Sequence, residues 1–374
     1  MHRTIMHIVE APGGVERYLV MLLTKMKEYP ETEHILVCST SLNKEKFKGL
    51  VKSVTVIDSM HNPISVADMK AAARVRKEII RHDPDIVYCH SSKAGAIARI
   101  ANIGLHNKLI YNAHGWAFNM KGQSSSRIKL YETAEKMLAP LADTIVCISE
   151  YEKISALKHG ICSEDKLVVI NNGIDFDECR NLHPRSREEL HIPKDAFVVG
   201  TVGRLTTQKA PDVFVKMASE VKKAIPNAFF IMVGDDIGGG HYREETESQI
   251  NGAGLADCFL LTGWVSDPIN YIQIFDVGVL LSRWEGFGLA LPEYMFLGKP
   301  IVATKADAIP YVLGDAGLLV DIDNEKQAAE AVISLHDDRQ LRDALIEREK
   351  ERVKLFDVQR TADEHMKLFD QVVG

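Results

Sequence analysis

The chain has 374 residues, of which 46% are hydrophobic and 26% are charged, the balance of a folded globular protein. This composition excludes a disordered chain, a collagen-like repeat and a small disulfide-rich scaffold. Residues 1–180 carry 24 Lys and Arg against 21 Asp and Glu, whereas residues 181–374 carry 21 against 31. The net charge of -7 therefore comes from the second half, which argues against nucleic acid as the main partner because phosphate binding needs a concentrated basic surface.

The first half alternates short apolar runs with stretches whose apolar residues recur about every 3.6 positions. The runs predict strands at 5–9, 35–38, 54–57, 86–89, 109–112, 144–148 and 168–170. The periodic stretches predict helices at 15–27, 66–81, 93–103, 126–141 and 150–158. Such alternation requires crossover connections and predicts a parallel sheet with helices on both faces.

Residues 171–195 are polar, contain two prolines and lack a continuous apolar face, so we expect a linker there. The alternation then restarts, with strands expected at 197–202, 229–233, 259–262, 276–282, 301–303 and 318–320. Helices are expected at 211–223, 267–273 and 289–296, and from residue 325 to the end. The chain is thus predicted to form two doubly wound α/β domains.

The six cysteines are scattered without a CxxC pair, so we expect reduced, structural thiols. No apolar run reaches the roughly 18–20 residues that span a bilayer. The N-terminal segment meets Gly13-Gly14 too early to resemble a signal peptide. Together these features predict a cytoplasmic protein.

In each predicted domain, one short motif follows the first strand. Gly13-Gly14 either forms a tight turn or brings backbone N–H groups at a helix start close to a phosphate; no GxGxxG fingerprint is present. Arg204 and Lys209 place two cations after a strand in an otherwise acidic domain. They form either a solvated loop or, as we favour, a site for a diphosphate.

The run from Glu285 to Glu293 follows another apolar strand. Gly286 and Gly288 would expose N–H groups at a helix start, and each carboxylate could bind a pair of vicinal hydroxyls, one on a sugar and the other on a ribose. We expect Glu293 about two turns into the helix. A helix-initiating acidic turn would explain Glu285 alone, but not the glycines and Phe287.

These motifs together resemble the retaining family-4 glycosyltransferases of the GT-B fold over nearly the whole chain. The resemblance rests on Gly13-Gly14, NAHGW, ISEYEK, NNGID, the Arg204/Lys209 pair, VGDD, TGWV and the Glu-x7-Glu run. It implies two facing Rossmann-like domains with an inter-domain cleft. Residues 1–180 would bind the acceptor, residues 181–355 the nucleotide-sugar donor, and residues 356–374 would form a helix crossing back to the first domain.

Carried over to this sequence, the resemblance implies that Arg204 and Lys209 neutralise the leaving diphosphate and that Glu285 binds the donor sugar. His114, in NAHGW, would lie near that sugar as a proton acceptor or as a group that orients a hydroxyl. Glu293 would bind the ribose. The remaining donor contacts would come from Gly14, Gly234, Trp264, Val265, Phe287, Gly288 and Leu289.

The implied reaction transfers a sugar with retention from a nucleotide-sugar, most simply a UDP-sugar, to a glycan or a polyprenyl-diphosphate-linked saccharide in capsule or exopolysaccharide synthesis. No metal or other cofactor is implied. Three Asp-x-Asp triplets, at 83–85, 175–177 and 321–323, are expected to be turn and cap residues rather than metal ligands.

Other interpretations stay open. A nucleotide-sugar epimerase of the UDP-GlcNAc 2-epimerase type could use the same two-domain architecture, and a non-catalytic glycan- or nucleotide-binding protein could share the motifs. The stretch 120–141, which mixes Lys and Arg with apolar residues, is either an amphipathic helix packed on the sheet or a surface for the inner face of the plasma membrane.

Overall fold

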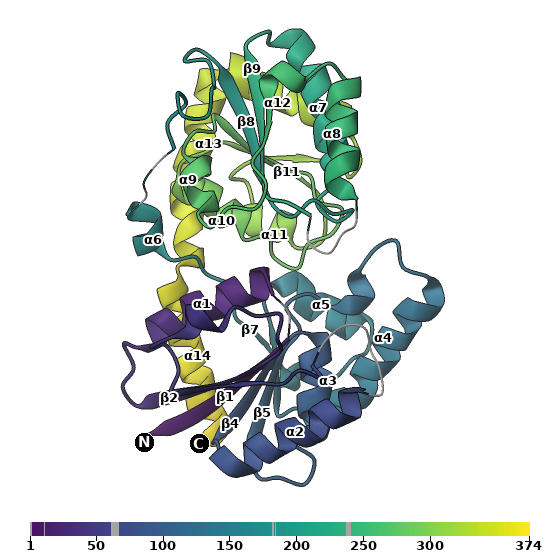
Figure 1. The fold of residues 1–374 in the computed structure, drawn as a ribbon, viewed down its shortest axis with the longest axis vertical. Helices are drawn as coiled ribbons and strands as arrows, with labels where there is room; N and C mark the ends of the chain where they lie inside the picture. The colour runs from purple at the N-terminus through teal and green to yellow at the C-terminus, as the bar shows by residue number, and fades with distance from the viewer. Residues whose placement is uncertain (1, 11, 61–66, 182, 184, 237–240) are drawn as a thin grey trace. The chain divides into compact units, whose positions relative to one another are not determined.

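The computed structural model describes residues 2–10, 12–60, 67–181, 183, 185–236 and 241–374. The chain divides into two compact units, one formed by Met1–Ile174 with Phe356–Gly374 and the other by Asp175–Leu355. Each unit is a parallel sheet with helices on both faces, so the predicted α/β class with two doubly wound domains is confirmed (Figure 1). The boundary predicted between residues 180 and 181 falls at the end of a short helix, α6 (Phe176–Arg180), in the second unit.

The sheet of the first unit has the strand order β3-β2-β1-β4-β5-β6-β7, and all its neighbours are parallel. Every strand expected from the apolar runs in this half is present, with ends within three residues of the prediction. The strands are β1 (Arg3–Val9), β2 (Thr32–Cys38), β3 (Ser53–Val56), β4 (Ile86–His90), β5 (Lys108–Asn112), β6 (Thr144–Cys147) and β7 (Leu167–Val169).

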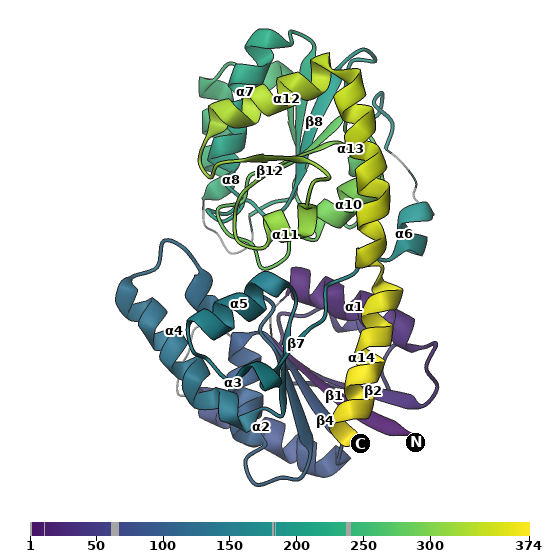
Figure 2. The same cartoon turned by 180° about the vertical axis from the view of Figure 1, so that it is seen from behind.

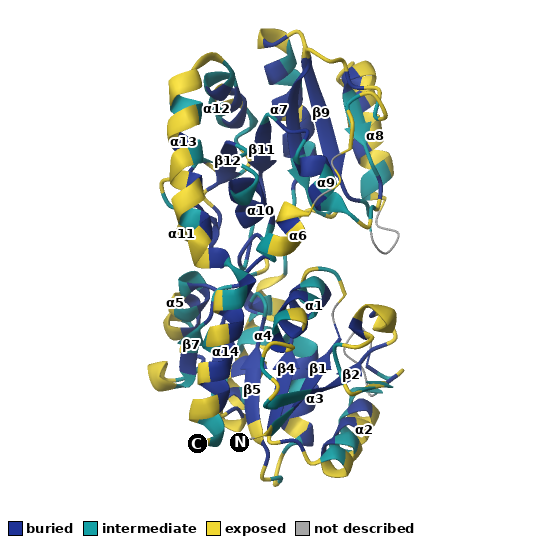
Figure 3. Cartoon of the chain, turned by 90° about the vertical axis from the view of Figure 1, so that its left-hand side faces the viewer, coloured by how far each residue is buried: buried dark blue, intermediate teal, exposed yellow. Residues whose placement is uncertain are grey.

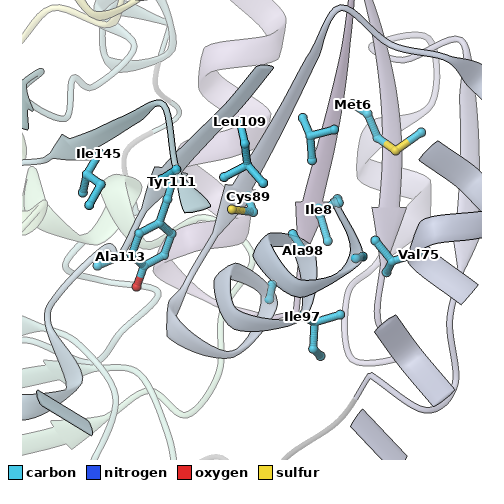
Figure 4. Packing of buried hydrophobic residues seen from close by; sticks show 14 of the residues in the cluster. Met6, Ile8, Val75, Cys89, Ile97, Ala98, Leu109, Tyr111, Ala113 and Ile145 are labelled. Carbon is cyan, nitrogen blue, oxygen red and sulfur yellow. The ribbon is translucent and has the colours of Figure 1, made fainter. Parts of the chain in front are cut away.

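Helices cover both faces of this sheet, as Figures 1 and 2 show from opposite sides. One face carries α1 (Gly14–Met26) and the C-terminal helix α14 (Val358–Val373), which turns its buried residues toward the strands (Figure 3). The other face carries α2 (Ala67–His82) and α3 (Ser92–Ala101). There Val75, Ile97 and Ala98 pack against strand residues such as Cys89 and Leu109 (Figure 4).

Two further helices of the first unit are α4 (Ser125–Leu138) and α5 (Glu150–Lys158). Only Glu135 of α4 is fully buried, where it accepts hydrogen bonds from Arg99 (2.9 Å) and Tyr111 (2.8 Å). Ile128 and Tyr131 pack partly on the core, whereas Leu130 and Met137 are 60% and 73% exposed. The helix therefore packs on the sheet with one side and presents apolar side chains on another.

The second unit has the strand order β10-β9-β8-β11-β12-β13, again parallel throughout. Its strands are β8 (Phe197–Val202), β9 (Ala228–Val233), β10 (Phe259–Leu261), β11 (Val277–Leu280), β12 (Ile301–Thr304) and β13 (Leu318–Val320). The predicted helices correspond to α7 (Pro211–Ala224), α9 (Pro268–Ile272), α10 (Ala290–Phe296), α12 (Glu325–Asp337), α13 (Arg339–Arg352) and α14.

Three helices lie where none was predicted. Helix α8 (Tyr242–Gly252) buries only Thr246 and Ile250, so its sequence carries almost no apolar periodicity. Helix α11 (Ile309–Leu313) and helix α6 are only five residues long. Helix α6 lies within the expected linker, and the carboxylate of Asp175, which precedes and caps it, accepts hydrogen bonds from two backbone N–H groups of the first turn.

The NNGID motif lies where the chain leaves β7 and runs beside the start of α14. Ile174 exchanges backbone hydrogen bonds with this segment: its N–H donates to Phe356 (2.8 Å), and its carbonyl accepts from Val358 (2.9 Å). A Cβ at Gly173 would lie 2.5 Å from the backbone of Val358. Glycine is therefore required here by close backbone packing, which gives the motif a structural reason.

The six cysteines are all free thiols, as predicted, and five of them are buried. Among the described helices, none is both long and apolar enough to span a bilayer.

Candidate functional site

Most of the residues predicted to bind the donor follow four neighbouring strands of the second unit. Gly203 to Lys209 follow β8, Gly234 follows β9, Gly263 to Val265 follow β10, and Ser282 to Leu289 follow β11. In the sheet these strands stand in the order β10-β9-β8-β11. Because the carboxyl ends of parallel strands form one edge, the fold gathers these segments at the edge where α/β domains bind ligands.

Lys209 and Glu285 form an ion pair at this edge, although they are 76 residues apart in the chain. The Glu285 side chain is 8% exposed and that of Lys209 is 22% exposed. Glu285 also accepts a hydrogen bond from the Ser282 hydroxyl (3.0 Å). A carboxylate held in this way presents fixed acceptors, and the Lys209 ammonium has further N–H groups for an anion.

Arg204 is exposed at the same edge and forms no ion pair with any described residue. Lys209 precedes Ala210, which adopts a left-handed conformation (φ 51°), and Pro211 is the first residue of α7, as expected for a proline that starts a helix. The predicted cationic pair thus consists of one free guanidinium and one ammonium already bound to a carboxylate.

A second arginine, Arg283, holds this loop in place and was not predicted. Its guanidinium donates to Asp212 (2.7 Å), Asp323 (2.7 Å) and the carbonyl of Thr207 (2.9 Å). It therefore ties the loop after β8 to the segment after β11. The sequence around Arg283 did not predict this role, because two of its hydrogen-bond partners lie 71 and 76 residues away in the chain.

Gly234 and Gly263 bring the loops after β9 and β10 together through an antiparallel bridge. A Cβ at Gly234 would lie 2.1 Å from the carbonyl oxygen of Gly203, so packing alone requires glycine there. Trp264 is 61% exposed beside this bridge, and Val265 is partly exposed. The indole face of Trp264 is thus available to a planar ligand.

The helix after Glu285 begins at Ala290, so Glu293 stands in its first turn and the expected position two turns into the helix is wrong. The segment from Glu285 to Leu289 is an extended turn in which Phe287 and Gly288 are buried and Gly288 has a positive φ of 85°. Glu293 is only 1% exposed. The predicted contact of Glu293 with a ribose therefore requires the nucleotide to reach a buried carboxylate.

In the first unit, Gly14 is the first residue of α1, which follows β1 directly. It is exposed, and a Cβ there would meet no atom within 4 Å. Packing therefore does not require glycine at position 14, whereas Gly13 adopts a φ of 84°. The turn conformation thus depends on Gly13, and the role of Gly14 in ligand binding stays a prediction.

His114 lies after β5 in a left-handed conformation (φ 52°) and is partly buried. Its Nε2 is 3.0 Å from His90 Nδ1, and its ring meets Tyr18 of α1 edge-on at 4.8 Å. Burial, with a smaller contribution from the nearby His365, lowers the pKa of His114 to about 3. His114 is therefore a neutral imidazole at pH 7, which can donate at one nitrogen and accept at the other.

Glu152, within the ISEYEK motif, fixes the loop that carries His114. Its carboxyl accepts hydrogen bonds from the N–H of Ile148 (3.0 Å) and from that of Gly115, and its carbonyl accepts from the Trp116 indole (3.0 Å). Burial raises the pKa of Glu152 to about 8. No role was predicted for this residue, because its burial and its contacts depend on the tertiary fold.

The Asp-x-Asp triplets take turn, cap and ion-pair roles. Asp85 accepts from the N–H of Thr4 (2.8 Å), Asp175 caps α6, and Asp323 pairs with Arg283. A hollow of about 280 Å³ lies beside the loop after β8, between the start of α7 and α8. Of the segments described above it touches only Thr207 and Arg283, so it does not coincide with the predicted donor contacts.

Two family models match this chain, one in each half. The model "Glycosyltransferase Family 4" matches residues 12–178, and the model "Glycosyl transferases group 1" matches residues 183–352.

Among curated relatives, an Escherichia coli UDP-Gal:alpha-D-GlcNAc-diphosphoundecaprenol alpha-1,3-galactosyltransferase is 28% identical over 74% of this chain and 72% of its own length. A lipopolysaccharide core biosynthesis glycosyltransferase of Rhizobium meliloti is 26% identical over 99% of both chains. A solved Anabaena protein in complex with UDP-glucose has a similar fold, with a TM-score of 0.83 at 21% identity over 99% of this chain and all of that one.

Proposed function

This chain belongs to the family-4, group 1 glycosyltransferases, and we propose that it transfers a sugar from a UDP-sugar to a glycan acceptor, with retention and without a metal ion. The Rhizobium meliloti relative is named for lipopolysaccharide core biosynthesis and the Escherichia coli relative for a diphosphoundecaprenol-linked acceptor, which supports a role for this enzyme in surface polysaccharide synthesis. The observation that carries the proposal is the pairing of Lys209 with Glu285 at one sheet edge, beside the exposed Arg204.

The chemistry of the donor follows from these groups. Arg204 and Lys209 would stabilise the negative charge that grows on the diphosphate as the glycosidic bond breaks. Lys209 can keep its bond to Glu285 and still donate to a phosphate oxygen, because an ammonium has three N–H groups. Glu285 would then accept hydrogen bonds from sugar hydroxyls, so the ion pair couples recognition of the sugar to that of the diphosphate.

Retention has two chemical routes. A double displacement requires a carboxylate nucleophile on the far face of the sugar, as in retaining glycosidases. We nominate none, and we propose a front-face reaction in which the leaving phosphate helps to remove the proton of the acceptor hydroxyl. His114 would bind a neighbouring hydroxyl of the acceptor.

Incubation of the full chain with a series of UDP-sugars and a polyprenyl-diphosphate-linked saccharide tests the activity, with products followed by mass spectrometry. We expect transfer that survives EDTA and an α-linked product from an α-linked donor, seen by NMR. Strict dependence on Mg²⁺ or Mn²⁺ would contradict the metal-independent reaction, and inversion would contradict the front-face route. Conversion of donor to an epimer without acceptor would identify an epimerase instead.

We also propose that the exposed side of α4 rests on an anionic membrane, where a lipid-linked acceptor would be found. Arg127, Leu130 and Met137 lie three and seven residues apart, so they share one side of the helix, and all three are exposed. A helix at a membrane surface inserts apolar side chains into the lipid and places Lys and Arg near the anionic headgroups.

Cosedimentation with vesicles of anionic lipid tests this surface. Leu130→Ser with Met137→Ser should release most of the bound protein, because both apolar anchors are lost. The matched control is Met69→Ser, a methionine that is 76% exposed on another helix, α2. Equal loss of binding in the control, or none in the α4 variant, would overturn the proposal.

A further inference from the structure

Four histidines of the first unit form a continuous hydrogen-bonded series, and only His114 among them has a role above. His34 on β2, His7 on β1, His90 at the end of β4 and His114 after β5 are joined by ring nitrogen distances of 3.0, 3.1 and 3.0 Å. His7, His34 and His90 are fully or almost fully buried on the face of the sheet that α1 and α14 cover. Figure 1 shows how β2, β1, β4 and β5 follow one another across the unit.

Every link of this series has the same polarity. His114 Nε2 meets His90 Nδ1, His90 Nε2 meets His7 Nδ1, and His7 Nε2 meets His34 Nδ1. A neutral imidazole has one N–H donor and one acceptor nitrogen. The tautomer of any one of these histidines therefore determines the tautomer of the other three.

All four rings are held in the neutral form that this coupling requires. Burial lowers the pKa of His7 and His90 well below the ordinary value, with a further contribution from neighbouring histidines. Burial also lowers the pKa of His34 to about 4. Among the described residues no three His, Cys, Asp or Glu side chains converge as metal ligands do, so the rings act in series rather than around an ion.

Thr32 gives the series its direction. Its hydroxyl lies 2.9 Å from the carbonyl oxygen of Tyr29, which can only accept, so the Thr32 proton is donated there. The same hydroxyl oxygen is 3.2 Å from His34 Nε2 and must accept from it. His34 is therefore protonated on Nε2, and the polarity of the links makes His7, His90 and His114 Nε2–H tautomers as well.

We propose that this relay of Thr32, His34, His7 and His90 holds His114 as its Nε2–H tautomer, so that His114 Nδ1 offers a lone pair to that neighbouring hydroxyl of the sugar acceptor. The four are positioning residues, and the inference rests on the proposed function for the identity of the hydroxyl. Thr32 pairs with Arg3 at the amino end of β1. A residue at the amino ends of the strands thus sets the tautomer of a histidine that follows their carboxyl ends.

The tautomers can be read directly in the full chain labelled with ¹⁵N-histidine, because protonated and unprotonated ring nitrogens have distinct ¹⁵N shifts. We expect His7, His34, His90 and His114 all to be Nε2–H at pH 7. His365 is an internal control, since its Nδ1 is 2.7 Å from the Thr361 carbonyl and must carry the proton instead. An Nδ1–H or charged state in any of the four would overturn the relay.

Thr32→Val and Thr32→Ser test the consequence for catalysis. The valine variant keeps the β-branched shape but removes the acceptor, so His114 should become a mixture of tautomers and kcat should fall by the lost fraction of the Nε2–H form, about twofold for an equal mixture. KM for the donor should not change, and Thr32→Ser should retain the wild-type values. Wild-type kcat in Thr32→Val would overturn the inference. A protein with the expected tautomers but no transfer to any acceptor would overturn the proposed function and leave the relay standing.

Discussion

Removal of the Lys209 ammonium should destabilise the second unit as well as stop transfer. In Lys209→Met, the Glu285 carboxylate, 8% exposed, keeps the Ser282 hydroxyl but loses its cation. Removing one partner of a buried ion pair costs about 3–5 kcal/mol, and the 22% exposure of Lys209 reduces our expectation to about 2–3 kcal/mol. For a unit of this size that corresponds to a fall of roughly 4–12 °C in Tm.

A double-mutant cycle in urea or thermal unfolding measures this coupling. Lys209→Met with Glu285→Gln should recover most of the lost stability, because the amide needs no cation. Lys305→Met serves as the control, since its ion pair with Asp321 is half exposed and should contribute less than about 1 kcal/mol. If Lys209→Met matches this control in stability, the argument that Glu285 depends on Lys209 is refuted. If the double variant folds but does not transfer sugar, loss of activity cannot be attributed to unfolding.

Three further predictions concern single residues. Gly14→Ala should leave unfolding unchanged within about 0.5 kcal/mol, because a Cβ has room there, and should raise KM for the UDP-sugar; an unchanged KM would remove Gly14 from the donor site. Glu152→Ala should free the loop of His114 and lower kcat, whereas Glu152→Gln should preserve most activity because the neutral amide still accepts from the backbone. Burial raises the pKa of Glu349 from 4.5 to about 9, so its carboxyl stays protonated in the fold and stability falls as pH rises between those values; Glu349→Gln should add about 3 kcal/mol at pH 7 and little near pH 4.5, and a pH-independent gain in urea unfolding would contradict this.

Local sequence determined the order and type of most elements. Buried parallel strands are apolar along their whole length, so runs such as 86–89 and 229–233 predicted β4 and β9 within one residue at each end. Helices that pack on a sheet need a regular apolar stripe, which located α1 and α7. Helix α8 lacked that signal, because the second unit buries only two of its side chains.

Motif spacing also predicted which segments would gather at the carboxyl edge of the second sheet, since each follows a strand. It could not predict which side chains would touch. The contacts at the site join residues distant in the chain. Lys209 pairs with Glu285, Arg283 donates to the loop after β8, and Glu152 binds the loop that carries His114.

The histidine series shows this difference most clearly. In the sequence, His7, His34, His90 and His114 are isolated residues, and only His114 lies in a motif. Strand order places β2, β1, β4 and β5 side by side, and the pleat turns His7, His34 and His90 to one face. The sequence alone thus determined the two α/β domains and the edges that would bear the site. Only the tertiary structure decided the partners, burial and protonation of the side chains there, because those properties depend on contacts between strands that the chain order does not specify.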